Sequence, residues 1–289
     1  MDNSKKKKKQ RGAVAETWHR FCKNKLAVCG LVILIIFFLA AIFADFIAPY
    51  DYAEQNLNAI GLSPSAEHIM GTDNVGRDMF SRVVYGARIS LQIGFISVGI
   101  SLVIGTVLGA IAGFYGKMAD TIIMRIVDIM LSIPSVLLAI VIASVLGTGM
   151  QNLMIAIGIS SVPSYARIVR ASILSLRDQE YIEAARLAGC SDFRIICRHI
   201  MPNILAPVIV QVTLSLGLAI LNASALSFLG LGVQAPQPEW GSMLAAGRNY
   251  MRQYPHIVLY PGLAIALLVL SLNMIGDGLR DALDPRMKN

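Results

Sequence analysis

Charge is the scarcest property of this sequence. Only 15% of its 289 residues are Asp, Glu, Lys or Arg, whereas about 25% are charged in an ordinary soluble domain. Hydrophobic residues make up 55% of the chain, and they are gathered into long runs instead of recurring at the period of a soluble core. The composition therefore excludes an ordinary soluble protein and predicts an all-α integral membrane protein.

Cysteine is also scarce, and none of the four cysteines belongs to a CxxC pair. Cys190 and Cys197 lie near His199, so a metal site there is an alternative, but small apolar thiols on a helix are the interpretation we favour. The four histidines are scattered along the chain and make no ligand cluster: His19, His68, His199 and His256. We therefore expect no metal.

The signatures of catalysis are absent as well. The chain has no GxxxxGK[ST] phosphate loop, no HExxH and no GxSxG, which mark nucleotide binding, zinc hydrolases and serine nucleophiles. The apolar runs also lack the paired carboxylates and cations of an ion-coupled carrier. We predict a chain that is not an enzyme and binds no cofactor of its own. The alternatives from other classes are a channel or ion-driven carrier, and a membrane scaffold or receptor.

The apolar runs predict six membrane-spanning helices, because one crossing needs about 20 apolar residues. Glycines recur along the second run, which predicts close packing against another helix. The first run is longer than the apolar core of about 7 to 15 residues in a signal peptide, so we interpret it as an uncleaved helix. The expected spans, in a transmembrane domain over 26–289 that follows a basic segment at 1–25, are 26–46, 88–115, 126–147, 150–168, 205–230 and 257–277.

Basic residues are distributed unequally between the two sides of this arrangement. Most lie in 1–25, in 167–198 and in the tail, whereas only five arginines fall in the connections of the other side. The positive-inside rule places both termini and the loop at 169–203 in the cytoplasm of a multi-pass protein of the cell membrane. The lysine run at 5–9 is interpreted as a topology determinant, with attraction to anionic lipid as the alternative. No folded basic face accompanies it, so we expect no nucleic-acid partner.

A charged segment, EAARLAGCSDFRIICRHIMPN at 183–203, separates the fourth and fifth spans. Asp178 is a good N-cap for a helix over 179–188, and Gly189 supplies the left-handed residue that ends it. A second helix is expected to begin at Ser191 and to lead into the fifth span. The segment would then be a rigid helical hairpin between two spans.

The first of these helices presents a small, mixed face made by Glu183, Ala184 and Leu187. Such a face suits a groove on another protein. We interpret the hairpin as a lever that docks on a partner, with a solvated connector as the alternative.

The same residues resemble a known family. The pattern Glu183-Ala184-Ala185, Gly189 and Pro202 is similar to the EAA loop of ATP-binding-cassette importer permeases. Three further stretches are similar to the C-type permease subunit of dipeptide and oligopeptide importers: GTDNVGRDMFSRVVYGARISL at 71–91, LSFLGLGVQAPQPEWGSML at 226–244 and GDGLRDALDPRMK at 276–288.

The resemblance implies a type I importer permease fold that pairs with a homologous second permease. Two ATPase subunits would bind ATP and Mg and dock on the EAA loop, and an extracellular or periplasmic binding protein would deliver a dipeptide or oligopeptide. Nickel and glutathione are alternative cargoes within the family. His199 and Met201 depart from the family pattern, which has Ile and Leu there. The implied coupling residues are Glu183, Ala184, Ala185, Leu187, Gly189 and Pro202.

The outer connections are the next most informative parts. Residues 45–88 form a long connection, helical from 77 to 88, and 233–256 form a Pro-rich one. Long ordered loops are usually functional, so we interpret them as a docking rim for the binding protein, with a structural plug as the alternative. Polar residues at membrane depth are candidates for the cargo path, although such residues more often join helices: Gln211, Asn222, Ser224 and Asn273.

Overall fold

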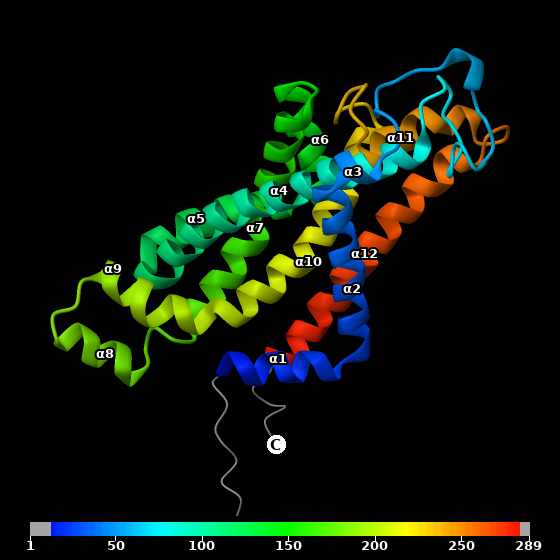
Figure 1. The fold of residues 1–289 in the computed structure, drawn as a ribbon. Coiled ribbons are helices and arrows are strands. Elements are labelled where there is room, and N and C mark those ends of the chain that lie inside the picture. Colours follow the sequence, from blue (N-terminus) through cyan, green and yellow to red (C-terminus); the bar gives the residue numbers. More distant parts are fainter. Residues whose placement is uncertain (1–12, 284–289) are drawn as a thin grey trace, which may run out of the picture.

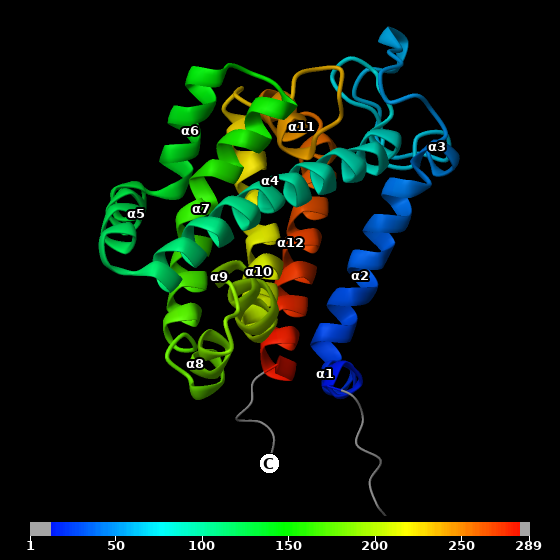
Figure 2. The same cartoon turned by 90° about the vertical axis from the view of Figure 1, so that its left-hand side faces the viewer.

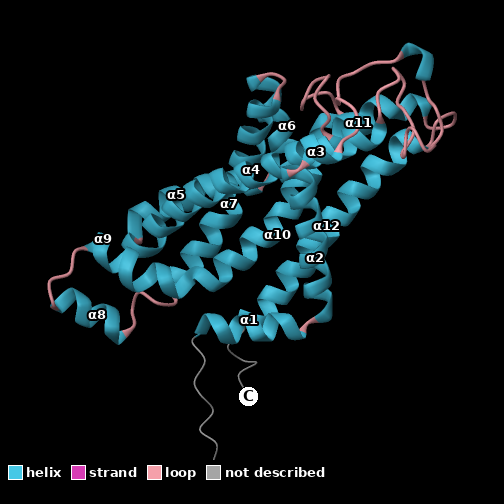
Figure 3. Ribbon diagram, in the orientation of Figure 1, coloured by secondary structure: helices cyan, strands magenta, loops and turns pink. Residues whose placement is uncertain are grey.

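The structure, a computed structural model, describes residues 13–283, and this part of the chain contains helices and no strand (Figure 3). The lysine run at 5–9 and the last residues of the tail lie outside the described residues. The main helices are α1 (Ala13–Lys23), α2 (Lys25–Ile42), α3 (Ala44–Ile47), α4 (Met79–Tyr115), α5 (Lys117–Leu131), α6 (Ser135–Leu146), α7 (Met150–Leu174), α8 (Glu180–Leu187), α9 (Asp192–Arg194), α10 (Met201–Phe228), α11 (Trp240–Gly247) and α12 (His256–Leu283). Short 3-10 turns are η1 (Leu57–Ala59) and η3 (Arg248–Tyr250), and η2 (Ile195–Ile200) is a π-helical turn.

Within residues 13–283, five helices are long and apolar enough to cross a membrane, and the bent pair α5 and α6 would make a sixth. The all-α membrane architecture predicted from composition is therefore confirmed. Helix α4 begins at Met79, well before the expected span at 88, because the Asp78 carboxylate accepts a hydrogen bond from the Ser81 N–H at 2.7 Å and caps its first turn. The helix expected between 77 and 88 is thus the outer end of α4.

The third expected span, 126–147, is corrected by the structure. It is not one helix: α5 begins at Lys117 and ends at Leu131, and α6 leaves it at an angle of 92°. Pro134 explains the break, since proline disfavours helical backbone in the residue before it and has no N–H to donate. Because residues 129–147 contain no charged side chain, their apolar length predicted a single span across the proline.

Helices α4 and α7 form the most extensive helix pair of the bundle. Glycines allow this approach: a Cβ added at Gly109 would lie 2.5 Å from the carbonyl oxygen of Ala166, and one at Gly158 would lie 2.8 Å from Cβ of Ile100. Small residues bring helix backbones together where lipid provides no hydrophobic drive for association. The close packing predicted from the glycines of this run is confirmed.

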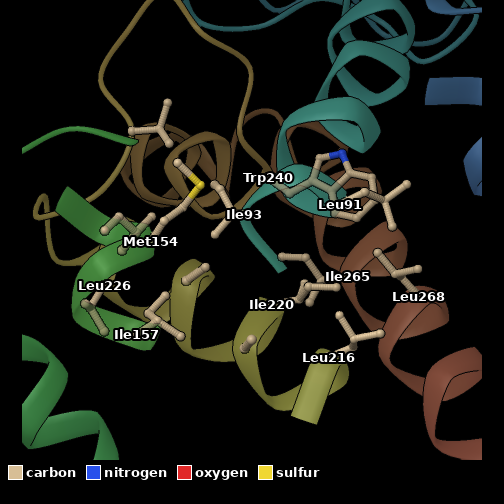
Figure 4. Packing of buried hydrophobic residues seen from close by; sticks show 14 of the residues in the cluster. Leu91, Ile93, Met154, Ile157, Leu216, Ile220, Leu226, Trp240, Ile265 and Leu268 are labelled. Atoms are coloured by element: carbon tan, nitrogen blue, oxygen red, sulfur yellow. The ribbon is translucent and has the colours of Figure 1, made fainter. Parts of the chain in front are cut away.

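The main core joins residues of α2, α4, α6, α7, α10 and α12 with α11, and Figure 4 shows part of it. Leu91 and Ile93 of α4 meet Ile157 of α7 and Ile220 of α10 in this cluster. Trp240 of α11 is fully buried and donates its indole N–H to the carbonyl oxygen of Val83 at 3.0 Å. The outer connection that carries α11 is therefore fastened to α4 by the core itself.

The two ends of the bundle differ in what they carry. Helices α1 and α8 and the end of α12 lie at one end, whereas α3, α11 and the long loops lie at the other (Figures 1 and 2). Helix α1 runs across the end of α2, and its Phe21 packs with Ala27, Ile275 and Ala282. The charged segment between α7 and α10 thus shares an end with both described termini.

Candidate functional site

The first candidate site is the α8–α9 segment, residues 179–194, which projects from the end of the bundle (Figure 1). Its inner face is anchored: Ile182 is fully buried and Ala185 is 9% exposed. Both pack in a cluster that includes Ile173 of α7, Ile195 of η2 and Ile204 of α10. The segment is consequently held against two spanning helices and not tethered by a flexible loop.

The outer face of the same segment carries exposed apolar side chains. Leu187 is 91% exposed and Phe193 is 77% exposed. Glu183 and Ala184 are exposed beside them. Large apolar residues that protrude from a rigid element are typical of a surface that binds another protein. The structure therefore brings together a fixed inner face and an open outer face.

The residues expected to couple this segment to a partner are divided by the structure. Four of them lie on the exposed surface, namely Glu183, Ala184, Leu187 and Gly189. Ala185 lies on the buried side. Pro202 is in the first turn of α10, beyond the segment. Sequence reasoning missed Phe193, whose only signal was a large apolar residue in a charged stretch.

The turn of the segment follows the sequence prediction at its end and departs from it at its start. Gly189 has φ +77°, and the Cys190 N–H donates to the Ala185 carbonyl at 3.1 Å, as in a helix that ends in a left-handed residue. The expected N-cap, Asp178, is corrected: α8 begins after Gln179, which makes no side-chain cap. Asp178 instead contacts its neighbour Arg177 at 3.4 Å.

The second helix of the segment is continuous with the fifth span. Ser191 precedes α9, as expected, and the chain then passes through the π-helical turn η2 into α10. In that turn the Met201 N–H donates to the Ile196 carbonyl. Pro202 explains the widening, because its ring would crowd the Arg198 carbonyl of a regular helix and it has no N–H for it.

Arginines hold the base of the segment to α4 and join α7 to α5. Arg177 donates from Nη1 to the Gly113 carbonyl at 3.1 Å, and the Arg186 guanidinium lies 5.2 Å from the centroid of the Phe114 ring. Arg170 of α7 donates to the Asp120 carboxylate of α5 at 2.6 Å. These contacts join the base of the segment to the end of α4, and the end of α7 to α5.

The second candidate site is a groove of about 530 Å³ between α10, α11 and α12. Its lining is mainly apolar, and it contains two of the four polar residues expected on a cargo path, Ser224 and Asn273. Asn222 is not among the lining residues. Gln211 lies elsewhere on α10 and donates to the Ser215 hydroxyl at 3.0 Å. Two of the four candidates thus face a common space.

A second cavity, of about 560 Å³ and here called the outer cavity, lies at the end of the bundle that carries α11 and the long loops, and it is lined partly by Asn74, Arg248 and Tyr250. Phe228 lines both this outer cavity and the groove. The two spaces are therefore adjacent at Phe228, and Asn273 lines the groove.

A buried ionic network builds the rim around the outer cavity. Arg77 donates from Nε to the Asp73 carboxylate at 2.6 Å, and Arg82 lies 3.6 Å from the same carboxylate. Arg82 also donates to the carbonyl oxygens of Tyr52, at 2.9 Å, and Pro236, at 3.3 Å. The two outer connections are thereby joined to each other through one guanidinium, so the stretch at 71–91 is a structural element of the rim.

Glu239 is a further buried acid of the rim. It is 1% exposed, and its carboxylate accepts hydrogen bonds from the N–H groups of Gly241 and Ser242, both at 2.8 Å, at the start of α11. Burial raises the pKa of Glu239, while these two backbone donors oppose the rise. Part of the rim is thus buried support: Arg77, Arg82 and Glu239 hold the two connections from inside.

Two known families match the chain. Residues 105–289 match the family described as binding-protein-dependent transport system inner membrane component. Residues 13–64 match the N-terminal TM domain of oligopeptide transport permease C.

Curated relatives align over nearly the whole chain. It is 55% identical to the dipeptide transport system permease protein DppC of Alkalihalophilus pseudofirmus, with 95% of this chain and 90% of that protein covered. It is 48% identical to the di/tripeptide transport system permease protein DppC of Pseudomonas aeruginosa, with 95% and 92% covered. It is 43% identical to the glutathione transport system permease protein GsiD of Pectobacterium atrosepticum, with 95% and 91% covered.

Solved structures share the fold at low sequence identity. The inward-facing MetNI methionine ABC transporter matches with a TM-score of 0.57 and 20% identity, over 71% of this chain and 98% of that chain. An amino acid ABC transporter matches with a TM-score of 0.55 and 15% identity, over 71% and 95%. At these identities the likeness concerns the arrangement of helices alone.

Proposed function

The chain belongs to the family of binding-protein-dependent transport system inner membrane components, and we propose that it forms, with a homologous second permease, the path by which dipeptides or oligopeptides cross the cell membrane. It is a multi-pass permease subunit of an ABC importer, with the type I permease fold. ATP and Mg would be bound by separate ATPase subunits, and this chain would contribute no catalytic group. A binding protein would deliver the peptide to the outer rim.

The observation that carries this proposal is the two-faced α8–α9 segment. Its inner face is packed on α7 and α10, and its outer face exposes Leu187 and Phe193. An ATPase pair that binds the outer face would move the spanning helices with it, because the inner face is close-packed against α7 and α10. ATP binding would favour one state of the path through its differential affinity for the two states.

Peptide is the cargo favoured by the relatives. The two relatives of higher identity named above are a dipeptide and a di/tripeptide permease. Glutathione is the second candidate, because the third relative is a glutathione permease at 43% identity. Reconstituted importer with its binding protein distinguishes them when uptake of a labelled dipeptide, glutathione and nickel is measured with and without ATP. Dipeptide uptake that needs ATP is the expected result, and uptake of glutathione alone would reassign the cargo.

The proposed orientation places both termini and the α8–α9 segment in the cytoplasm. The concentration of basic residues at that end supports it. In a cysteine-free background, single cysteines at the exposed positions Ser63 and Gln237 should react with a membrane-impermeant thiol reagent on intact cells. A cysteine at the exposed position Ser175 should react only after lysis. Reaction at Ser175 on intact cells would invert the topology.

A further inference from the structure

The groove and the outer cavity together have an unusual distribution of charge. Among the described residues that line the two spaces, Arg248 is the one charged side chain, and no Asp or Glu is present. The other polar side chains of the outer cavity are neutral: Asn74, Asn249 and Tyr250. A cation entering these spaces would meet no carboxylate ligand and one positive charge, whereas an anion would meet a guanidinium.

Arg248 is available to a ligand. Its side chain is exposed, and no carboxylate of the described chain lies within ion-pair distance of it. Its guanidinium carbon lies 5.6 Å from the centroid of the Phe228 ring, a contact that orients the group by cation–π attraction. Phe228 is also the residue shared by both spaces. The positive charge is therefore held at their junction.

The groove beyond this junction suits an apolar group. Leu221, Ile265 and Leu270 are among its lining residues, and Ser224 and Asn273 are its two polar side chains. A ligand with an anionic end and an adjacent apolar side chain would place the first at Arg248 and the second in the groove. Guanidinium pairs well with carboxylate, because its donors match the two oxygens.

We propose that Arg248 and the groove form a subsite for the free terminal carboxylate of the cargo peptide and the apolar side chain next to it. The proposal rests on the peptide-import function and adds a selection step made by the permease itself. The subsite binds peptide acids in preference to peptide amides and excludes hydrated metal cations. Arg248 is a recognition residue, since it acts by direct contact with the cargo.

The test uses the complete importer in nanodiscs, without the binding protein, so that recognition by that protein cannot mask the permease. The probes are a dipeptide that carries a photoreactive leucine analogue at its C-terminus and the same dipeptide as its C-terminal amide. After irradiation, mass spectrometry locates the adducts. In the wild type, the acid should label α10 and α12 about tenfold more than the amide, which is the discrimination expected from one charge-assisted pair.

Three variants in and just after η3 make the test more specific. Arg248→Gln should remove the preference for the acid, Arg248→Lys should retain part of it, and the matched control Arg252→Gln, which changes an exposed arginine outside both linings, should keep it in full. Equal labelling by acid and amide in the wild type would overturn the subsite, as would an unchanged preference in Arg248→Gln.

Peptide uptake is measured in parallel with the binding protein restored. If uptake persists while the labelling shows no preference, the subsite proposal fails and the import function stands. If no peptide is imported, the proposed function itself fails, whatever the labelling shows.

Discussion

Ile182 and Leu187 lie on opposite faces of one short helix, the first fully buried and the second 91% exposed. They are five residues apart and divide α8 into a face that packs against the rest of the bundle and a face that is open at the surface. Substitutions at the two positions should therefore have different effects. The inner residue should affect the stability of the permease, and the outer one should affect binding of a partner.

We expect Leu187→Asp to leave the free energy of unfolding of the permease within about 0.5 kcal/mol of wild type, as for other exposed positions, and to weaken binding of the ATPase pair tenfold or more, as for an interface anchor of about 2 kcal/mol. Ile182→Ala should instead destabilise the permease by about 2 to 5 kcal/mol. Thermal denaturation in detergent and a pull-down with purified ATPase separate the two effects. Equal loss of stability in both variants would contradict the two-faced description.

The end of α8 depends on one left-handed residue. A Cβ at Gly189 would meet nothing within 4 Å, so the positive φ is the sole source of strain on substitution. Gly189→Val should cost about 1 to 2 kcal/mol and reorient the hairpin, whereas Gly189→Asn should be tolerated, since Asn visits this conformation. ATPase binding measured for both variants checks this: the valine variant is expected to bind weakly and the asparagine variant normally. Equal binding by the two would show that the turn does not matter.

Two glycines of α4 provide a matched pair. A Cβ at Gly109 would lie 2.5 Å from the Ala166 carbonyl oxygen, whereas one at Gly99 would meet nothing within 4 Å. Gly109→Val should therefore force α4 and α7 apart at a cost of about 1 to 3 kcal/mol. Gly99→Val should leave the melting temperature unchanged. A similar loss in both variants would mean that helix propensity, and not close packing, sets the effect.

One buried acid of the rim, Glu239, predicts a pH dependence. Burial raises the pKa of Glu239 from its ordinary value of 4.5, so the folded state holds the proton more tightly than the unfolded chain. The stability contributed by the protonated acid is present below pH 4.5 and is lost as the pH rises through the folded pKa. Glu239→Gln should flatten this fall in melting temperature, and the exposed control Glu67→Gln should preserve it. An unchanged slope in Glu239→Gln would assign the pH dependence to another group.

The sequence was sufficient for the features that depend on local physics. Apolar length was enough to predict an all-α membrane architecture. The position of Gly189 at the end of a helical pattern predicted its left-handed conformation. The break at Pro134 carried a sequence signal, but the uninterrupted apolar run outweighed it. Asp178 was assigned as a cap from its residue type, and the structure begins the helix one residue later than that assignment required.

The features that the sequence could not predict depend on distant segments. Arg82 joins Tyr52 and Pro236, which are far from each other along the chain. Ser224 and Asn273 line one groove while Asn222 does not, because the rotation of α10 against α12 decides which side chains face the space. A single sequence shows which residues of a helix are polar, but it does not show which face of that helix its neighbours leave open.

The central claim is that the outer face of the α8–α9 segment couples ATP hydrolysis to peptide movement. Its most direct test is the ratio of peptide imported to phosphate released, measured in the same proteoliposomes for the wild type and for the double variant Leu187→Asp, Phe193→Asp. Both side chains are exposed, so the variant should fold and reach the membrane. At ATPase concentrations high enough to restore assembly, the account predicts a ratio far below that of wild type. Import at the wild-type ratio would contradict it.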